Sequence, residues 1–235
     1  KLVVAAAALE TLGPEYRYRT EVLALPAAED SMVAALVIVG AGDPTLSRRF
    51  HPEGPHPIEM LADSIAAAGV RRIVGDVVVD ASRFDSLGVH PTWEVGDLRW
   101  AYAAPAAAFA IDEGATAVTV APGGVAGSTA RVEALAPLGH IAIASDVVTD
   151  TAGARRVLRP PLAPVRDTVR LHGAIPLDAP EDTIRLAVSD PAATAARALA
   201  AALEARGVAL GGRVRIVYDS VEAAALREGG HPVAR

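Results

Sequence analysis

Two groups of residues have the chemistry of a functional site. Lys1 opens an apolar helix, and a lysine amine that has lost its proton can act as a general base toward a hydroxyl one helical turn away. The alternative is an ordinary charged residue at a helix end. The second group is Trp93, Asp97 and Tyr102, because aromatic walls suit a methylene chain and a carboxylate pairs with an ammonium. Its alternative is a loop that the tryptophans pack onto the core, and Trp100 is an alternative aromatic wall.

Other motifs predict no ligand site. The GAGD string at 40–43 lacks the third glycine of a dinucleotide fingerprint and the lysine of a phosphate loop, so it predicts a tight turn at Asp43. The GGVAG string at 123–127 lies between two strand-like segments and predicts a hairpin turn. His51 and His56 are five positions apart across Pro and Gly, which is not a helical ligand pair. We therefore predict no metal site and no cofactor.

The composition is that of a globular chain. Of 235 residues, 51% are hydrophobic, 21% charged and 4% aromatic, and the net charge of −6 without a long run of one sign gives no electrostatic reason to bind nucleic acid. The absence of cysteine excludes disulfides, thiolate metal sites and a cysteine nucleophile. No apolar run approaches the roughly 18 residues that a membrane span needs, so no transmembrane segment is predicted. The small basic patch of Arg155, Arg156 and Arg159 suggests a solvated edge or, alternatively, contact with an anionic polymer.

The elements that must position these residues change in type along the chain. The first hundred residues predict helices at 1–17, ended by Gly13-Pro14, and at 58–68, with strands at 18–25, 32–40 and 71–82. A loop with both tryptophans follows. From about 106, short alternating segments separated by Gly, Pro and Asp predict an antiparallel sheet or sandwich. Asp190 is expected to cap a helix that ends at Gly207, followed by a strand at 213–220 and a tail without periodic pattern.

The first segment also resembles a known family. The string KLVVAAAALETLGPEYRYRTEV is similar to the segment after the first catalytic motif of low-molecular-mass class C penicillin-binding proteins, the D-alanyl-D-alanine carboxypeptidase/endopeptidase family. That family's pattern is Ser-x-x-Lys-Leu, a small-residue helix, Leu-Gly-Pro, an acidic residue, Tyr-Arg-aromatic and Thr-Glu. The matching residues are Lys1, Leu2, Leu12, Gly13, Pro14, Glu15, Tyr16, Arg17, Tyr18, Thr20 and Glu21.

Five further blocks resemble the same family in the same order. They include a Gly-x-Gly-Asp-Pro-Thr-Leu string, a strand that ends in Asp-x-Ser-x-Phe, and a Trp…Asp…Tyr-x-Ala-Pro stretch. A Gly-x-Ile-Pro element and an Asp-Pro helix that ends in Gly-Val complete the set. In this chain they read GAGDPTL from Gly40, GDVVVDASRF ending at Phe84, WEVGDLRWAYAAPAAA from Trp93, HGAIPL from His172 and SDPAATAARALAAALEARGVALGG from Ser189. Each block is weak alone, but the ordered set is specific.

The resemblance implies acyl transfer. A serine one helical turn before Lys1 would attack the carbonyl of a D-Ala-D-Ala peptide, the lysine would take its proton, and water would hydrolyse the acyl-enzyme. The implied partners are peptidoglycan stem peptides, with β-lactams as inhibitors that acylate the same serine. Trp93, Asp97 and Tyr102 are carried over as substrate-binding residues for a diaminopimelate side chain.

The chain departs from the family pattern in three places. The nucleophilic serine, the Ser-x-Asn motif and the Lys-Thr/Ser-Gly motif are missing from these residues; the SVE string at 220 lacks the asparagine. Because the chain opens with Lys-Leu-Val-Val and no methionine, it is expected to be the interior of a longer product. We predict that these 235 residues alone do not turn over substrate.

The fold expected from the resemblance is α+β and multidomain. Residues 1–18 would be the helix stub of a transpeptidase-like, β-lactamase-like catalytic domain. Residues 19–43 with 105–235 would form a β-rich inserted domain, and 44–104 a smaller α/β domain nested in it. The implied function is a serine-type D-Ala-D-Ala peptidase, periplasmic or extracellular and associated with the cell wall. The alternative is a non-catalytic module that binds cell wall or a partner.

Overall fold

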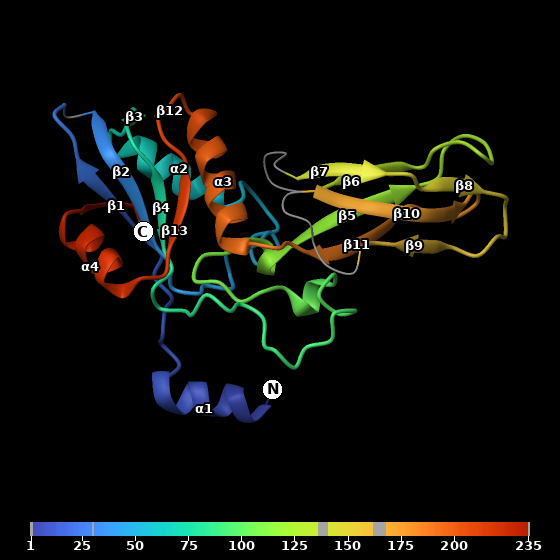
Figure 1. Cartoon of the computed structure of the whole chain (residues 1–235), viewed down its shortest axis with the longest axis horizontal. Helices are drawn as coiled ribbons and strands as arrows, with labels where there is room; N and C mark the ends of the chain where they lie inside the picture. Colours follow the sequence, from blue (N-terminus) through green and yellow to red (C-terminus); the bar gives the residue numbers. More distant parts are fainter. Residues whose placement is uncertain (1, 30, 136–140, 162–167, 235) are drawn as a thin grey trace.

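The computed structural model describes residues 2–29, 31–135, 141–161 and 168–234. They form two lobes and one helix that stands apart from both (Figure 1). One lobe is a mixed sheet covered by helices, called here the α/β lobe. The other is built of strands alone, called here the β lobe. The expected α+β class with several sheets is therefore confirmed.

The α/β lobe is organised around a seven-stranded sheet in which β2 occupies a central place. β2 pairs antiparallel with β1 and parallel with β3 and β4, and β1 pairs in turn with β14. Because both faces of β2 are covered, its sequence is almost continuously apolar and not alternating. The strands are β1 (Glu21–Pro26), β2 (Met32–Val39), β3 (Arg72–Ile73), β4 (Val77–Asp80), β12 (Ala209–Leu210), β13 (Val214–Val217) and β14 (His231–Ala234).

Two helices cover one face of this sheet and a third packs against the other. α2 (Pro57–Ala67) begins in a capping box between His56 and Glu59, and α3 (Pro191–Glu204) begins where Asp190 accepts from the amide of Ala193. Both helices bury their apolar stripes in the main core with Phe109, which is fully buried. α4 (Ser220–Glu228) contributes to a smaller core on the opposite face. The helices predicted at 58–68 and after Asp190 are thus confirmed.

The β lobe packs two small sheets around one apolar core. β5 lies between β6 and β11, and β10 lies among β7, β8 and β9. The predicted hairpin is confirmed, since β5 and β6 pair antiparallel on either side of 123–127. β10 runs parallel to β7 and β8, so the lobe is not wholly antiparallel as expected. The strands are β5 (Ala115–Ala121), β6 (Arg131–Ala134), β7 (Ala142–Ser145), β8 (Val148–Asp150), β9 (Val157–Arg159), β10 (Thr168–Pro176) and β11 (Asp182–Ala187).

The sheet pairing differs from the predicted division of the chain. The prediction placed residues 19–43 with the β-rich part and 44–104 in a separate nested unit. Instead β1 and β2 share one sheet with β3, β4 and the final strands. The β lobe, 115–187, is the inserted part, and the α/β lobe is the part interrupted by it. Strand pairing depends on contacts distant in sequence, so a change of local pattern near 105 marked the boundary without showing which part encloses the other.

At the two ends of the chain, one prediction from the sequence is confirmed and one is wrong. α1 (Leu2–Leu12) ends at Gly13, whose φ of 79° supplies the left-handed cap that the sequence predicted. None of its residues is buried, and it stands below the two lobes in Figure 1. The prediction of a tail without periodic pattern at 225–235 was wrong, because this segment holds the last four residues of α4 (Ser220–Glu228) and all of β14. These short elements are stabilised by packing on β1 and not by a long apolar repeat.

Candidate functional site

The loop that carries Trp93, Asp97 and Tyr102 joins β4 to two short 3₁₀ turns, η1 (Ala101–Ala103) and η2 (Asp112–Gly114). In the view of Figure 1 the loop projects on the same side of the molecule as α1. Trp93 is 42% exposed and Tyr102 is 72% exposed. Large aromatic side chains at this exposure are available to a ligand or to another part of the protein.

The structure brings Asp97 and Tyr102 together. The Tyr102 hydroxyl donates to Oδ1 of Asp97 at 2.7 Å, and this hydrogen bond raises the pKa of Tyr102 above its ordinary value. The hydroxyl therefore stays protonated at neutral pH and holds one oxygen of the carboxylate. Trp93 lies earlier on the same loop, where its amide donates to the His90 carbonyl at 3.0 Å.

Trp100 has a different place from Trp93. It forms an isolated antiparallel bridge with Leu186 of β11 and packs, partly buried, against the core of the β lobe. The guanidinium of Arg99 lies over its ring at 5.9 Å. Trp100 therefore anchors the loop to the β lobe, as the alternative interpretation expected of a tryptophan, while Trp93 remains exposed.

Two of the family-like blocks meet at the start of this loop. Gly42 has a φ of +70°, and a Cβ built there would lie 2.6 Å from Cζ of Phe84. Only glycine combines this backbone conformation with so close an approach. Asp43 accepts from both the amide and the hydroxyl of Thr45, at 2.8 and 2.7 Å, which confirms the predicted tight turn.

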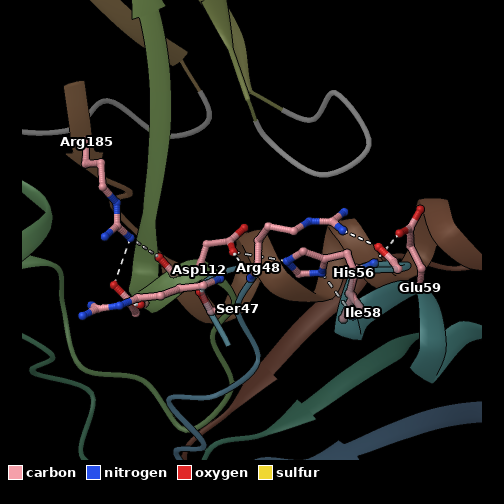
Figure 2. A network of polar contacts seen from close by, with 10 residues as sticks. Ser47, Arg48, His56, Ile58, Glu59, Asp112 and Arg185 are labelled. Carbon is pink, nitrogen blue, oxygen red and sulfur yellow. Dashed lines mark hydrogen bonds and ion pairs between the residues drawn. The ribbon is translucent and has the colours of Figure 1, made fainter. Parts of the chain in front are cut away.

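A partly buried polar network lies where the two lobes join (Figure 2). His56 is 2% exposed, and its Nδ1 accepts from the amide of Ile58 at 3.2 Å, which places the ring hydrogen on Nε2. That nitrogen faces Oδ1 of Asp112 at 3.2 Å, and the amide of Arg48 donates to the same oxygen at 3.0 Å. The network thereby fixes the start of α2 against η2.

Arg185 extends this network into the β lobe. Its guanidinium donates to the Asp112 carbonyl at 3.2 Å and to Oε2 of Glu113 at 3.0 Å, and Arg49 lies 3.7 Å from the other Glu113 oxygen. Asp112 and Glu113 have positive φ values of 49° and 64°, which non-glycine residues adopt at a cost. A pocket of about 490 Å³ opens beside these groups. Each of these arginines has a partner in the chain, since Arg49 and Arg185 both reach Glu113 and Arg48 donates to the Gly54 carbonyl. The arrangement therefore joins the two lobes.

Asp112 makes the stability of this junction depend on pH. Partial burial acts to raise the pKa of its carboxyl, but hydrogen bonds from His56 and the Arg48 amide outweigh that effect and place the pKa below its ordinary value. A depressed folded-state pKa means that the stabilisation is complete above the unfolded value of about 3.9 and is lost as pH falls through the folded value.

We expect Asp112→Asn to lower the free energy of unfolding by about 1.5–3 kcal/mol at pH 7, as for a hydrogen bond to a charged group. The difference from the original chain should shrink below about pH 4. Thermal unfolding followed by circular dichroism between pH 7 and pH 3 measures it. A difference that is constant across this range would show that the carboxylate charge plays no part.

The roles predicted for Trp93, Asp97 and Tyr102 stay predictions, and the sequence did not predict the network around His56. Lys1 lies outside the described residues. His56 and Asp112 were not predicted as partners because they are 56 positions apart and belong to no common motif.

Within the described ranges, no group of three or more His, Cys, Asp or Glu side chains could hold a metal ion. In the same ranges, no helix has the length and apolar content to cross a membrane.

Comparison with known proteins identifies the family. The model of the D-Ala-D-Ala carboxypeptidase 3 (S13) family matches residues 1–229. The chain is 35% identical over 221 residues to a D-alanyl-D-alanine carboxypeptidase of Actinomadura sp. (strain R39), with 91% of this chain and 40% of that protein covered. It is 36% identical over 121 residues to carboxypeptidase Rv3627c of Mycobacterium tuberculosis, which covers 48% of this chain and 25% of the relative. The chain thus spans less than half the length of these curated relatives.

A solved structure shares the fold. Penicillin binding protein 4 from Haemophilus influenzae superposes with a TM-score of 0.78 at 21% identity, over 98% of this chain and 48% of that one. The same protein in complex with a β-lactam superposes with a TM-score of 0.70. The likeness covers both lobes, and the family match covers all six motif blocks. The chain belongs to the D-Ala-D-Ala carboxypeptidase 3 (S13) family.

Proposed function

We propose that this chain is the substrate-side part of a serine-type D-Ala-D-Ala carboxypeptidase/endopeptidase that acts on peptidoglycan peptides through an acyl-enzyme. Family membership supports the reaction class. The observation that carries the proposal for this chain is the hydrogen-bonded pair of Asp97 and Tyr102 on an exposed loop. The pair offers a carboxylate whose orientation is fixed, next to aromatic surface, which is what an amine-bearing side chain requires.

Lys1 has the role of general base in this proposal. A serine one helical turn earlier would point to the same side of the helix. The lysine would accept the hydroxyl proton as the oxygen forms its bond to the peptide carbonyl, and terminal D-alanine would leave. Water would then attack the ester, with release of the shortened peptide and the free serine. A β-lactam carbonyl would acylate the same oxygen and remain bound.

α1 belongs, in this proposal, to a catalytic domain that the two lobes adjoin. The apolar side chains of Leu2, Val3 and Val4 are 88, 82 and 73% exposed, an arrangement that a helix avoids unless another surface covers it. α1 and the Trp93–Tyr102 loop project on the same side in Figure 1. A domain that covers α1 from that side would also meet the loop.

The proposed setting is the periplasm or the outer face of the cell, in association with the wall. This location follows from the substrate, because peptidoglycan stem peptides occur there. The proposed partners are these peptides, with β-lactams as inhibitors. Nucleic acid is not among them, because the net charge of −6 opposes binding to phosphate backbones.

Substitution of Asp97 tests the substrate side. In the full-length protein, Asp97→Asn should raise KM about tenfold for a D-Ala-D-Ala peptide whose preceding residue has a free side-chain amine, because a hydrogen bond to a charged group is lost. The acetylated form of the same peptide has no ammonium and should be unaffected. Steady-state kinetics on the two peptides measures the difference.

Glu94→Gln is the matched control, since Glu94 is an exposed carboxylate on the same loop. It should leave both KM values within about twofold, because screened charges at exposed sites contribute little. An equal effect of the two substitutions would mean that the loop attracts the amine by general charge, and the assigned role of Asp97 would be wrong.

A further inference from the structure

The side chain of Arg99 makes contacts in two directions. Toward the loop, its Nε donates to the Gly96 carbonyl at 2.9 Å. Toward the β lobe, its Nη1 donates to the Pro160 carbonyl at 3.1 Å, across 61 positions of sequence. The planar guanidinium can hold two acceptors at a fixed angle, which a lysine ammonium on its flexible stem does not.

The backbone of Arg99 also joins the loop to the β lobe. Its carbonyl accepts from the amide of Ala187 at 3.0 Å, next to the bridge between Trp100 and Leu186. The loop is therefore joined to β11 by its main chain and to the residue after β9 by the guanidinium. Along this loop the residues change from exposed at 93–95 to half-buried at 96–100.

The Gly96 carbonyl that Arg99 holds immediately precedes Asp97. The carbonyl of Asp97 accepts from the amide of Trp100 at 2.9 Å, so that Gly96 to Trp100 forms a closed turn. The side chain of Asp97 leaves this turn toward Tyr102. The direction of the carboxylate thus depends on a turn that the guanidinium closes from the β lobe.

We infer that Arg99 is a positioning residue for substrate recognition, and that the β lobe sets the affinity for amine-bearing substrates through it. Arg99 touches neither the substrate nor the reacting atoms. It holds the turn at which the carboxylate of Asp97 is presented, and so gives the inserted β lobe a function in the reaction. This inference rests on the proposed function of the Asp97–Tyr102 pair.

The test measures discrimination between two peptides in the full-length protein. The ratio of KM for an acetylated lysyl-D-Ala-D-Ala peptide to KM for the same peptide with a free side-chain amine should be about ten in the original protein. Arg99→Ala should reduce this ratio to below about two, with kcat for both peptides changed by less than about twofold. Arg99→Lys should behave like Arg99→Ala, because it keeps the charge and loses the two-pronged geometry.

Arg185→Ala is the matched control, because Arg185 also joins the lobes but makes its contacts at η2, away from the loop. It should keep the ratio of the original protein. If Arg99→Ala keeps the ratio, or if Arg185→Ala loses it equally, the inference is overturned and recognition by Asp97 stands. If the original protein shows no discrimination and Asp97→Asn has no effect, the proposed site fails and takes the inference with it. Should Arg99→Ala not fold, Arg99→Lys gives the same decision.

Discussion

Substitution of Lys1 by alanine in the full-length protein is expected to slow acylation by a fluorescent penicillin by about 10²–10⁴-fold, the range that a positioned general base contributes. The serine hydroxyl would have no acceptor for its proton while its oxygen attacks the β-lactam carbonyl. The rate is measured from the time course of the labelled protein band at several penicillin concentrations. The effect should fall on the acylation rate.

Lys1→Arg is the control for charge. Arginine keeps the positive charge but does not give up its proton, so it cannot act as a base. It should lose as much activity as alanine does. The 235-residue chain alone should show no turnover of a D-Ala-D-Ala peptide, since it lacks the serine and the two later motifs. An active Lys1→Ala protein, or an active isolated chain, would contradict the peptidase mechanism proposed here.

Phe109→Ala is expected to have the largest effect on stability, a loss of about 3–5 kcal/mol in the free energy of unfolding. Phe109 is 0% exposed and packs in the main core with residues of α2, α3 and the sheet. Truncation removes apolar contact and leaves a cavity between elements that relax only in part. Urea unfolding followed by circular dichroism measures the change, and the midpoint should fall without a change in the slope.

Phe50→Ala is the matched control because the same atoms are removed from a ring that is 51% exposed. Its contact with the Arg49 guanidinium, 6.0 Å from the ring centre, is of the weak kind found at exposed sites. The loss should stay within about 0.5–1 kcal/mol. If the two substitutions cost the same, the main core does not depend on Phe109, and its assigned place in that core would have to be revised.

The sequence by itself determined the family and the local elements. Each of the six motif blocks is a continuous stretch of residues, so it can be recognised without knowledge of the fold. The order of the blocks along the chain sufficed to identify the family. Caps and turns were also predictable, because Asp190 before Pro191, Gly13 before Pro14 and the glycines at 123–127 act on neighbouring backbone groups. The exposed loop with Asp97 and Tyr102 was predicted for the same reason, since both residues belong to one block.

Only the tertiary structure decided which segments are partners. It showed that the β lobe is inserted into the α/β lobe and not the reverse, that His56 faces Asp112, and that Arg99 reaches the Pro160 carbonyl. It also distinguished Trp100, which anchors the loop, from the exposed Trp93. These contacts join residues far apart in the chain, and a local sequence pattern does not indicate which distant residues will meet. They are selected by burial of two separate cores, each of which forms only when its distant strands and helices have come together.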